Sequence, residues 1–178
     1  MIKINEESFD MVYQLFEEAF ILAELRPYEK MKELFLKEEF VIYGYNLEGK
    51  LAGAILVWEF DECIYLENFA VDSKLRNQGI GAAILKEIQQ IYSSHLIVLE
   101  VEEPIDELTT RRVHFYQRHQ FYLNPFHFIQ PALRENVEDV HLMLMSYPHC
   151  INEETFKNIR DLLFYKVYKQ NKEKEGIL

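Results

Sequence analysis

The sequence predicts an α/β protein with a mixed, mostly antiparallel central sheet that is flanked by helices and followed by an extra C-terminal helix. Three observations support this prediction: three strand-like segments joined by tight turns, a strand–loop–helix–strand unit after them, and amphipathic helical patterns at both ends. The 178 residues are 49% hydrophobic, which is enough to bury one core. We therefore expect residues 1–178 to form a single domain, with a core of about residues 1–147 and a C-terminal helix over about residues 152–170.

The N-terminal part of the chain predicts one short strand and two helices. Residues 1–5 alternate between apolar and polar side chains, and residues 6–20 place apolar side chains at helical spacing with acids between them. Pro27 suits the first turn of a second helix, whose apolar side contains Met31 and Leu34.

The middle of the chain predicts a meander of antiparallel strands. The expected strands cover residues 39–46, 51–60 and 64–71. Residues 47–50 have the composition of a hairpin turn, and Asp61 and Glu62 form a second tight turn. Consecutive strands joined in this way lie side by side in a sheet.

The second half of the chain predicts alternating helices and strands. The expected helices cover residues 79–90, 106–119 and 152–170, and the expected strands cover residues 96–101, 121–129 and 140–145. Asp106 is suited to cap its helix, and Asn152 opens the last one. The charged tail, residues 169–178, is expected to fray.

The loop after the third meander strand has the chemistry of an anion site. Gly79 and Gly81 open the following helix, and glycine lets a backbone approach a ligand closely. The first N–H groups of a helix have no partners within it, so together with the helix dipole they favour phosphate. Lys74 and Arg76 add positive charge beside them.

Two other interpretations of these glycines remain open from the residues alone. The first is an ordinary turn before an apolar helix. The second is a dinucleotide-binding fingerprint, for which Glu100 supplies the acid but Ile84 stands where the third glycine belongs. A phosphate-binding P-loop is excluded, because no Gly-Lys-Ser/Thr sequence occurs.

At these residues the chain resembles the GCN5-related N-acetyltransferases (GNAT), a family that moves an acyl group from acyl-coenzyme A to an acceptor. The family signature is Gln/Arg-x-x-Gly-x-Gly/Ala after a strand, and here it is RNQGIG at residues 76–81, preceded by NFAV at residues 68–71. A second block, VHFYQRHQF at residues 113–121, is similar to the family's Phe-Tyr-x-x-x-Gly-Phe. The chain departs from the family at Gln120, where a glycine in the left-handed conformation usually ends the helix, and at Thr109, where many members have asparagine.

The resemblance covers about residues 1–147 and implies the GNAT fold, with acetyl-CoA as co-substrate. The end of the third meander strand would pair its backbone with the pantetheine arm, and the helix start would give N–H groups to the pyrophosphate. The residues expected to bind the coenzyme are Phe69, Ala70, Val71, Arg76, Asn77, Gln78, Gly79, Ile80, Gly81, Ala82, Thr109 and Tyr116.

Acetyl transfer to an amine sets its own chemical demands. A lysine-type amine has a pKa of about 10.4, so a base helps to remove its proton, and the leaving thiolate needs an acid. Tyr116 matches the family tyrosine that points at the coenzyme sulfur, so it is the candidate acid. Glu67 is the candidate base, because it lies close to the point where the family opens its sheet, and Glu100 on the adjacent strand is the runner-up. A core tyrosine and structural carboxylates are the alternatives.

The composition argues against several other functions. The net charge of −11 argues against nucleic acid as a partner, although it mildly favours cationic acceptors. No apolar run approaches a membrane span, and the histidines and cysteines lack the spacing of metal ligands. With only Cys63 and Cys150 and no secretory signal, a cytoplasmic location is expected.

The leading hypothesis is therefore an N-acetyltransferase that moves an acetyl group from acetyl-CoA to a small-molecule or peptide amine. Direct attack in a ternary complex is favoured, because the sequence has no strong nucleophile motif. The alternative is a non-catalytic acyl-CoA-binding sensor or partner subunit. The last helix can pack on its own sheet or on a second copy, so a homodimer remains open.

Overall fold

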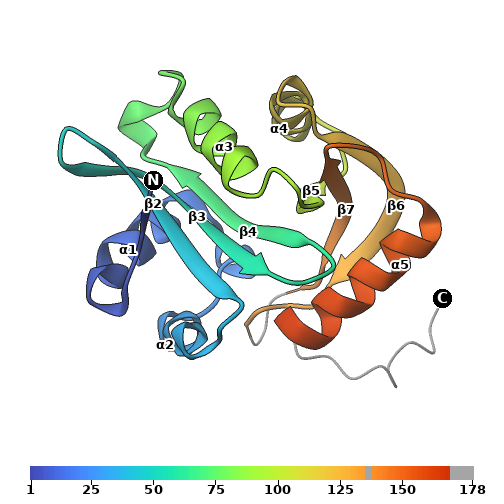
Figure 1. Cartoon of the computed structure of the whole chain (residues 1–178), viewed down its shortest axis with the longest axis horizontal. Helices are drawn as coiled ribbons and strands as arrows, with labels where there is room; N and C mark the ends of the chain where they lie inside the picture. The colour runs from blue at the N-terminus through green and yellow to red at the C-terminus, as the bar shows by residue number, and fades with distance from the viewer. Residues whose placement is uncertain (135–137, 169–178) are drawn as a thin grey trace.

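A seven-stranded sheet of order β1-β2-β3-β4-β5-β7-β6 forms the centre of the computed structural model, which describes residues 1–134 and 138–168 (Figure 1). Among these described strands only β4 and β5 pair in parallel, and every other neighbouring pair is antiparallel, so the predicted mixed sheet is confirmed. The strands are β1 (Ile2–Lys3), β2 (Phe40–Leu47), β3 (Lys50–Glu59), β4 (Ile64–Val71), β5 (Ile97–Glu102), β6 (Tyr122–Gln130) and β7 (Val140–Tyr147).

The helices are α1 (Phe9–Ala19), α2 (Tyr28–Lys32), α3 (Ile80–Ile91), α4 (Glu107–Arg118) and α5 (Glu153–Leu162). Short 3₁₀ turns cover Glu6–Ser8, Leu22–Glu24, Glu33–Leu36 and Ser73–Leu75, and α5 continues as a π-helical turn over Leu163–Val167. The second helix differs from the prediction, because Pro27 is extended and precedes its first turn. The predicted frayed tail, residues 169–178, lies outside the described residues, as do the last two residues of the predicted C-terminal helix.

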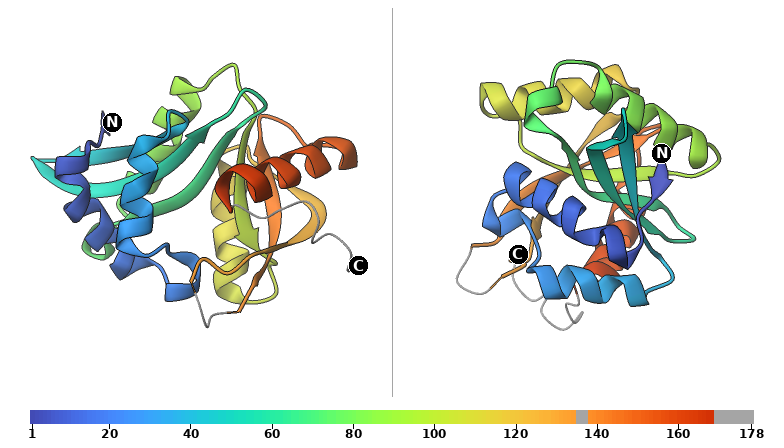
Figure 2. Two further views of the ribbon diagram at one scale, coloured as in Figure 1. Left: turned by 90° about the horizontal axis from the view of Figure 1, so that it is seen from below. Right: turned by 90° about the vertical axis from the view of Figure 1, so that its left-hand side faces the viewer.

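The strands separate two hydrophobic cores. α3 and α4 cover one face of the sheet, whereas α1, α2 and α5 cover the other (Figures 1 and 2). Successive side chains on a strand point to opposite faces, so Tyr65 of β4 joins the core under α1 and α5 while its neighbours Ile64 and Leu66 join the core under α3. Both faces of β4 are therefore buried, as its apolar sequence predicts.

Side-chain caps fix the starts of two helices. Asp106 accepts a hydrogen bond from the backbone N–H of Thr109 at 2.8 Å, and the Thr109 hydroxyl accepts one from the backbone N–H of Asp106 at 3.2 Å. This capping box confirms the predicted cap. Asn152 caps α5 by accepting from the backbone N–H of Thr155 at 2.8 Å.

The last helix packs on its own sheet. The ring of Phe156 in α5 stacks on that of Phe126 in β6, with 4.9 Å between centroids, and also meets the ring of Phe128 at 6.3 Å. Phe126 and Phe128 of β6 thus contribute to the core on this face of the sheet. A homodimer stays a prediction.

Gln120, in the turn between α4 and β6, adopts a left-handed conformation with φ of 65°. The left-handed turn expected at this position is therefore kept with glutamine in place of glycine, at the cost of a β-carbon clash. We expect Gln120→Gly to raise the free energy of unfolding by about 1 kcal/mol, measured by urea denaturation. Gln120→Ala, which keeps the β-carbon, is the control, and a less stable glycine variant would contradict the strain argument.

Candidate active site

The sheet opens between β4 and β5. Their parallel pairing is limited to Ile64 with Ile97, Tyr65 with Val98 and Leu66 with Leu99. β4 then continues to Val71 beside β3, and β5 continues to Glu102 beside β7. The two predicted base candidates, Glu67 and Glu100, are the next residues on each strand, so the structure brings them together at the opening.

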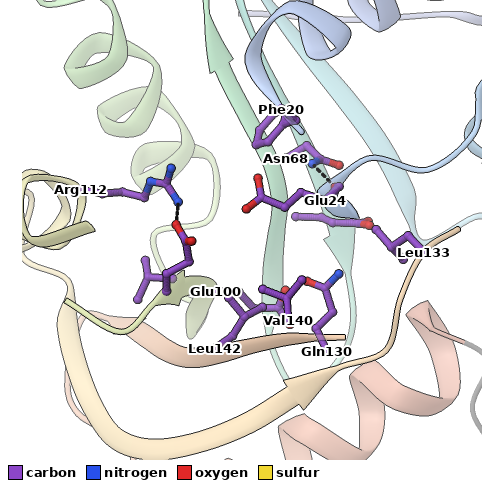
Figure 3. A pocket seen from close by; sticks show the side chains of 12 residues that line it. Phe20, Glu24, Asn68, Glu100, Arg112, Gln130, Leu133, Val140 and Leu142 are labelled. Atoms are coloured by element: carbon purple, nitrogen blue, oxygen red, sulfur yellow. Dashed lines mark hydrogen bonds and ion pairs between the residues drawn. The ribbon is translucent and has the colours of Figure 1, made fainter. Parts of the chain in front are cut away.

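A pocket lies at this opening, between β4, β5, β7 and the segment after α1 (Figure 3). Its lining contains four glutamates and one arginine, and its full set is Phe20, Glu24, Glu67, Asn68, Glu100, Val101, Glu102, Arg112, Gln130, Leu133, Val140 and Leu142. Figure 3 shows Glu24 and Asn68 on one side of the pocket and Arg112 on the opposite side. Arg112 donates to Glu102 at 2.8 Å, so the pocket keeps an excess of carboxylates.

Two tyrosine hydroxyls hold the Glu100 carboxyl group. Tyr65 donates to Glu100 Oε2 at 2.7 Å, and Tyr168 donates to Oε2 at 2.7 Å and to Oε1 at 2.9 Å. Burial raises the pKa of Glu100 to about 7, although these two hydrogen bonds act to lower it. Glu100 can therefore change its protonation state close to neutral pH, which suits a general base.

Glu67 is held by stronger partners. Arg26 Nε and Nη2 both lie 3.0 Å from Glu67 Oε1, and Trp58 Nε1 donates to Oε2 at 2.7 Å. The two side chains of the ion pair are 4% exposed for Glu67 and 12% exposed for Arg26. A buried pair of this kind is costly to break, because the remaining charge has no partner. Both oxygens of Glu67 are thus committed to structural contacts, and its assignment as base stays a prediction.

Asn68 presents a buried polar atom without a hydrogen-bond partner, and Glu24 lies beside it. Among the described residues, Asn68 Oδ1 is the only buried side-chain oxygen or nitrogen without a hydrogen-bond partner. Its Nδ2 donates to the Glu24 carbonyl at 3.4 Å. Burial raises the pKa of the Glu24 carboxyl group, against the nearby charge of Arg112. A buried acceptor of this kind calls for a hydrogen-bond donor, such as an ammonium group.

The predicted phosphate site has the expected backbone. Gly79 caps α3 with φ of 80°, a value that glycine adopts without strain. The first helical hydrogen bond runs from Ala83 N–H to the Gly79 carbonyl at 3.0 Å, so the N–H groups of Ile80, Gly81 and Ala82 have no acceptor within the helix. These groups are available to an anion.

The start of α3 lies against the end of β4. A β-carbon on Gly81 would lie 3.7 Å from Phe69 and Val71 and 3.5 Å from Phe115 of α4. Arg76 is exposed beside this turn, and its Nε donates to the Val71 carbonyl at 3.4 Å. The exposed side chains of Asn77 and Gln78 complete the loop, with Asn77 at φ of 63°. The structure therefore gathers the predicted coenzyme residues of β4 and α3 at one place.

The two predicted site residues of α4 differ in their surroundings. The Tyr116 ring packs against Phe115 and Phe121, with centroids 5.2 Å and 5.8 Å away. Burial raises the pKa of Tyr116 to about 12, so its hydroxyl keeps its proton at neutral pH. Thr109 is buried and its hydroxyl contacts Asp106 in the capping box, so its coenzyme contact stays a prediction.

Several residues of the site carry no signal in the sequence. Arg26, Tyr65 and Tyr168 belong to no recognisable motif. Asn68 begins the NFAV segment before the signature, but nothing in that segment assigns it a role. The roles of all four depend on contacts between distant segments. Within residues 1–134 and 138–168, no cluster of His, Cys, Asp or Glu side chains is arranged to hold a metal ion. In the same part of the chain, no helix has the length and apolar character needed to cross a membrane.

Comparison with known proteins gives consistent matches. Residues 9–121 match the model of the Acetyltransferase (GNAT) family. YjbC, a provisionally named acetyltransferase of Bacillus subtilis (strain 168), is 31% identical over 170 residues, covering 86% of each chain. A GNAT-family structure from Bacteroides thetaiotaomicron, provisionally assigned as an acetyltransferase, is 31% identical with a TM-score of 0.86, covering 93% of this chain and 94% of that chain.

More distant structures share the fold alone. The ribosomal-protein-S18-alanine N-acetyltransferase from Escherichia coli is 17% identical with a TM-score of 0.62, covering 86% of this chain and 95% of that chain. A mutant of the spermidine N-acetyltransferase SpeG from Vibrio cholerae is 14% identical with a TM-score of 0.61, covering 82% of this chain and 92% of that chain.

Proposed function

This chain belongs to the acetyltransferase (GNAT) family, and from this premise we propose that it transfers an acetyl group from acetyl-CoA to an amine by direct attack in a ternary complex. One observation carries the proposal. Consecutive residues of β4 border two different sites, because Phe69 and Val71 lie against the start of α3 while Glu67 and Asn68 line the acidic pocket. A coenzyme held by α3 and an amine held in the pocket would meet at the opening of the sheet.

The residues around α3 suit the coenzyme. The N–H groups at the start of the helix, from Ile80 to Ala82, and the exposed Arg76 would bind the pyrophosphate. The backbone groups of Phe69 and Val71 point away from β3, because those of Ala70 and Asp72 face β3, and they would pair with the amide groups of the pantetheine arm. Ala70, between them, would contact the arm by proximity alone. Acetyl-CoA supplies the thioester, and every other group in the reaction comes from the acceptor and this chain.

We assign the general base to Glu100 and the general acid to Tyr116. The Glu100 carboxylate takes a proton from the acceptor ammonium, directly or through one water, and leaves a neutral amine. The amine nitrogen forms a bond with the thioester carbonyl carbon, the carbon–sulfur bond breaks, and the thiolate takes the Tyr116 proton. The proton that the new amide nitrogen must lose returns to the Tyr116 oxygen through water, and Glu100 releases the proton it took to solvent. Glu67 remains the second candidate base, but its ion pair with Arg26 favours a positioning role.

The acidic pocket favours a cationic acceptor. Its glutamates attract an ammonium group, and the unsatisfied Asn68 Oδ1 offers that group an additional acceptor. A primary amine of a small molecule or a peptide fits this chemistry. We also propose a cytoplasmic location, which the free thiols of Cys63 and Cys150 support.

The test combines binding and turnover. Calorimetric titration with acetyl-CoA, beside NAD and ATP, precedes a screen of alkylamines, polyamines and peptides in which release of the coenzyme thiol is measured. Tyr116→Phe is expected to lower kcat about 100-fold with acetyl-CoA affinity nearly unchanged, because phenylalanine keeps the ring packing but cannot donate a proton. Tyr122→Phe, at an exposed position on β6, is the control.

The acid assignment, the catalytic activity and the coenzyme binding can each be contradicted by a separate result. Full activity of Tyr116→Phe would remove this residue as the acid. Binding of acetyl-CoA without turnover on any amine of the panel would favour the non-catalytic module instead. Absence of acetyl-CoA binding would overturn the function as a whole.

A further inference from the structure

The segment that follows α5 returns to the opening of the sheet. Leu163 and Val167 of its π-helical turn are buried, and Phe164 lies 6.3 Å from both Phe128 and Tyr168 between ring centroids. This segment lies outside residues 9–121, which match the family, and beyond the common core expected up to about residue 147. Its contacts with the site therefore come from a segment outside the part of the chain that matches the family model.

Tyr168 at the end of this segment contacts Glu100 directly. Its side chain is 8% exposed, and its hydroxyl donates to both oxygens of Glu100 at 2.7 Å and 2.9 Å. The Tyr65 hydroxyl lies 3.0 Å from the Tyr168 hydroxyl and completes a closed set of three groups. Tyr168 and Tyr65 together thus contact both carboxyl oxygens of Glu100.

The same segment contacts the second carboxylate through Arg26. Arg26 Nη2 donates to the Val167 carbonyl at 3.2 Å, and its guanidinium carbon lies 5.9 Å from the centre of the Tyr168 ring. Arg26 in turn pairs with Glu67. Tyr168 therefore contacts Glu100 directly, whereas Val167 and Tyr168 reach Glu67 only through Arg26.

We propose that Tyr168 is a positioning residue for Glu100, and that the C-terminal segment completes the active site. The inference rests on the proposed function, since it takes Glu100 as the proton acceptor. Tyr168 would act by holding the carboxylate toward the pocket and by stabilising its charged form through hydrogen bonds.

The charged and polar groups around Glu100 determine in which direction its pKa shifts when the Tyr168 hydroxyl is removed. The groups that face it are Tyr65 and Glu67 from β4, Arg26 before α2, and Tyr168. Burial and Glu67 favour the protonated form, whereas Arg26 and the two hydroxyls favour the carboxylate. Removing one hydroxyl while the other groups stay in place therefore shifts the balance toward the protonated form.

Tyr168→Phe in the full chain tests this inference, because phenylalanine keeps the ring and removes only the hydroxyl. Tyr165→Phe is the matched control, since that tyrosine lies in the same segment and is 64% exposed. The carboxyl ¹³C signal of Glu100, assigned with Glu100→Gln, is followed from about pH 5 to about pH 9. Tyr168→Phe is expected to raise the pKa of Glu100 by about 1, and Tyr165→Phe is expected to leave it unchanged.

The pH–rate profile gives a second readout. In Tyr168→Phe, the acidic limb of the kcat/KM profile is expected to shift to higher pH by the same amount as the pKa of Glu100. KM for acetyl-CoA is expected to stay the same. A lower melting temperature with an unchanged Glu100 pKa and an unchanged limb would reduce Tyr168 to a structural role and overturn the inference. Absence of turnover by the wild-type chain would overturn the proposed function. The carboxyl titration needs no acceptor, so it separates these two failures.

Discussion

Glu100→Gln is expected to lower kcat by about 100- to 10,000-fold while the affinity for acetyl-CoA changes little. Glutamine has the same shape, and its carbonyl oxygen still accepts from Tyr65 and Tyr168, but it cannot take a proton from the acceptor. Glu103→Gln is the control, because Glu103 directly follows β5, is exposed and does not line the pocket. Single-turnover rates and calorimetric titration of acetyl-CoA measure the two effects separately.

The pH dependence gives this prediction a direction. Below about pH 7 the wild-type Glu100 is protonated, so kcat/KM is expected to fall as the pH decreases through about 7, and Glu100→Gln is expected to lack this limb. Because the pKa is raised from 4.5 in the folded state, the contribution of this group to stability decreases as the pH rises between 4.5 and about 7. Glutamine removes that dependence. High activity in Glu100→Gln together with its loss in a folded Glu67→Gln variant would return the base assignment to Glu67.

Gly81→Glu is expected to weaken acetyl-CoA binding by more than about 100-fold. Gly81 lies in the first turn of α3, where the N–H groups have no acceptor within the helix, so a glutamate there places negative charge beside the pyrophosphate. Its side chain also extends toward Phe69, Val71 and Phe115, which lie within 3.7 Å of the β-carbon position. Calorimetric titration with acetyl-CoA measures the loss.

Gly81→Ala is the control that tests whether the loss of binding in Gly81→Glu comes from the charge and size of glutamate or from the loss of glycine. Its β-carbon would make ordinary van der Waals contacts at 3.5–3.7 Å, and alanine is favourable in a helix, so this variant is expected to bind acetyl-CoA like the wild type. Retained binding in a folded Gly81→Glu variant would contradict the assignment of the α3 start as the phosphate site. The variant's circular dichroism and melting temperature check that the fold is kept.

Local patterns in the sequence were sufficient for most of the fold. The ends of β4 and the cap at Asp106 depend on alternation, apolar runs and a short-range hydrogen bond, all of which lie within a few residues. Gly79 was predicted at the start of its helix for the same reason. The left-handed conformation of Gln120 follows from the position of the turn rather than from the residue type.

The candidate site was predicted only in part, because its electrostatics depend on residues far apart in the chain. Arg26 and Glu67 are separated by 41 positions, and Glu100 and Tyr168 by 68 positions. No pattern in the sequence distinguishes a glutamate that is paired with arginine from one that is buried beside two hydroxyls. Only the contacts of Glu67 and Glu100 in the folded structure therefore distinguish the two glutamates as candidate bases.

The short pairing of β4 with β5 has a consequence for the rigidity of the molecule. β1–β4 and β5–β7 are two half-sheets whose strands meet over three residue pairs, so the seam between them contains few backbone hydrogen bonds. Amide groups along such a seam are expected to exchange with solvent more readily than those within either half. A bound coenzyme would act there like an additional strand and would close the seam, and by mass action its binding free energy would add to the stability of the native state. The substrate of this protein would then also be part of its architecture.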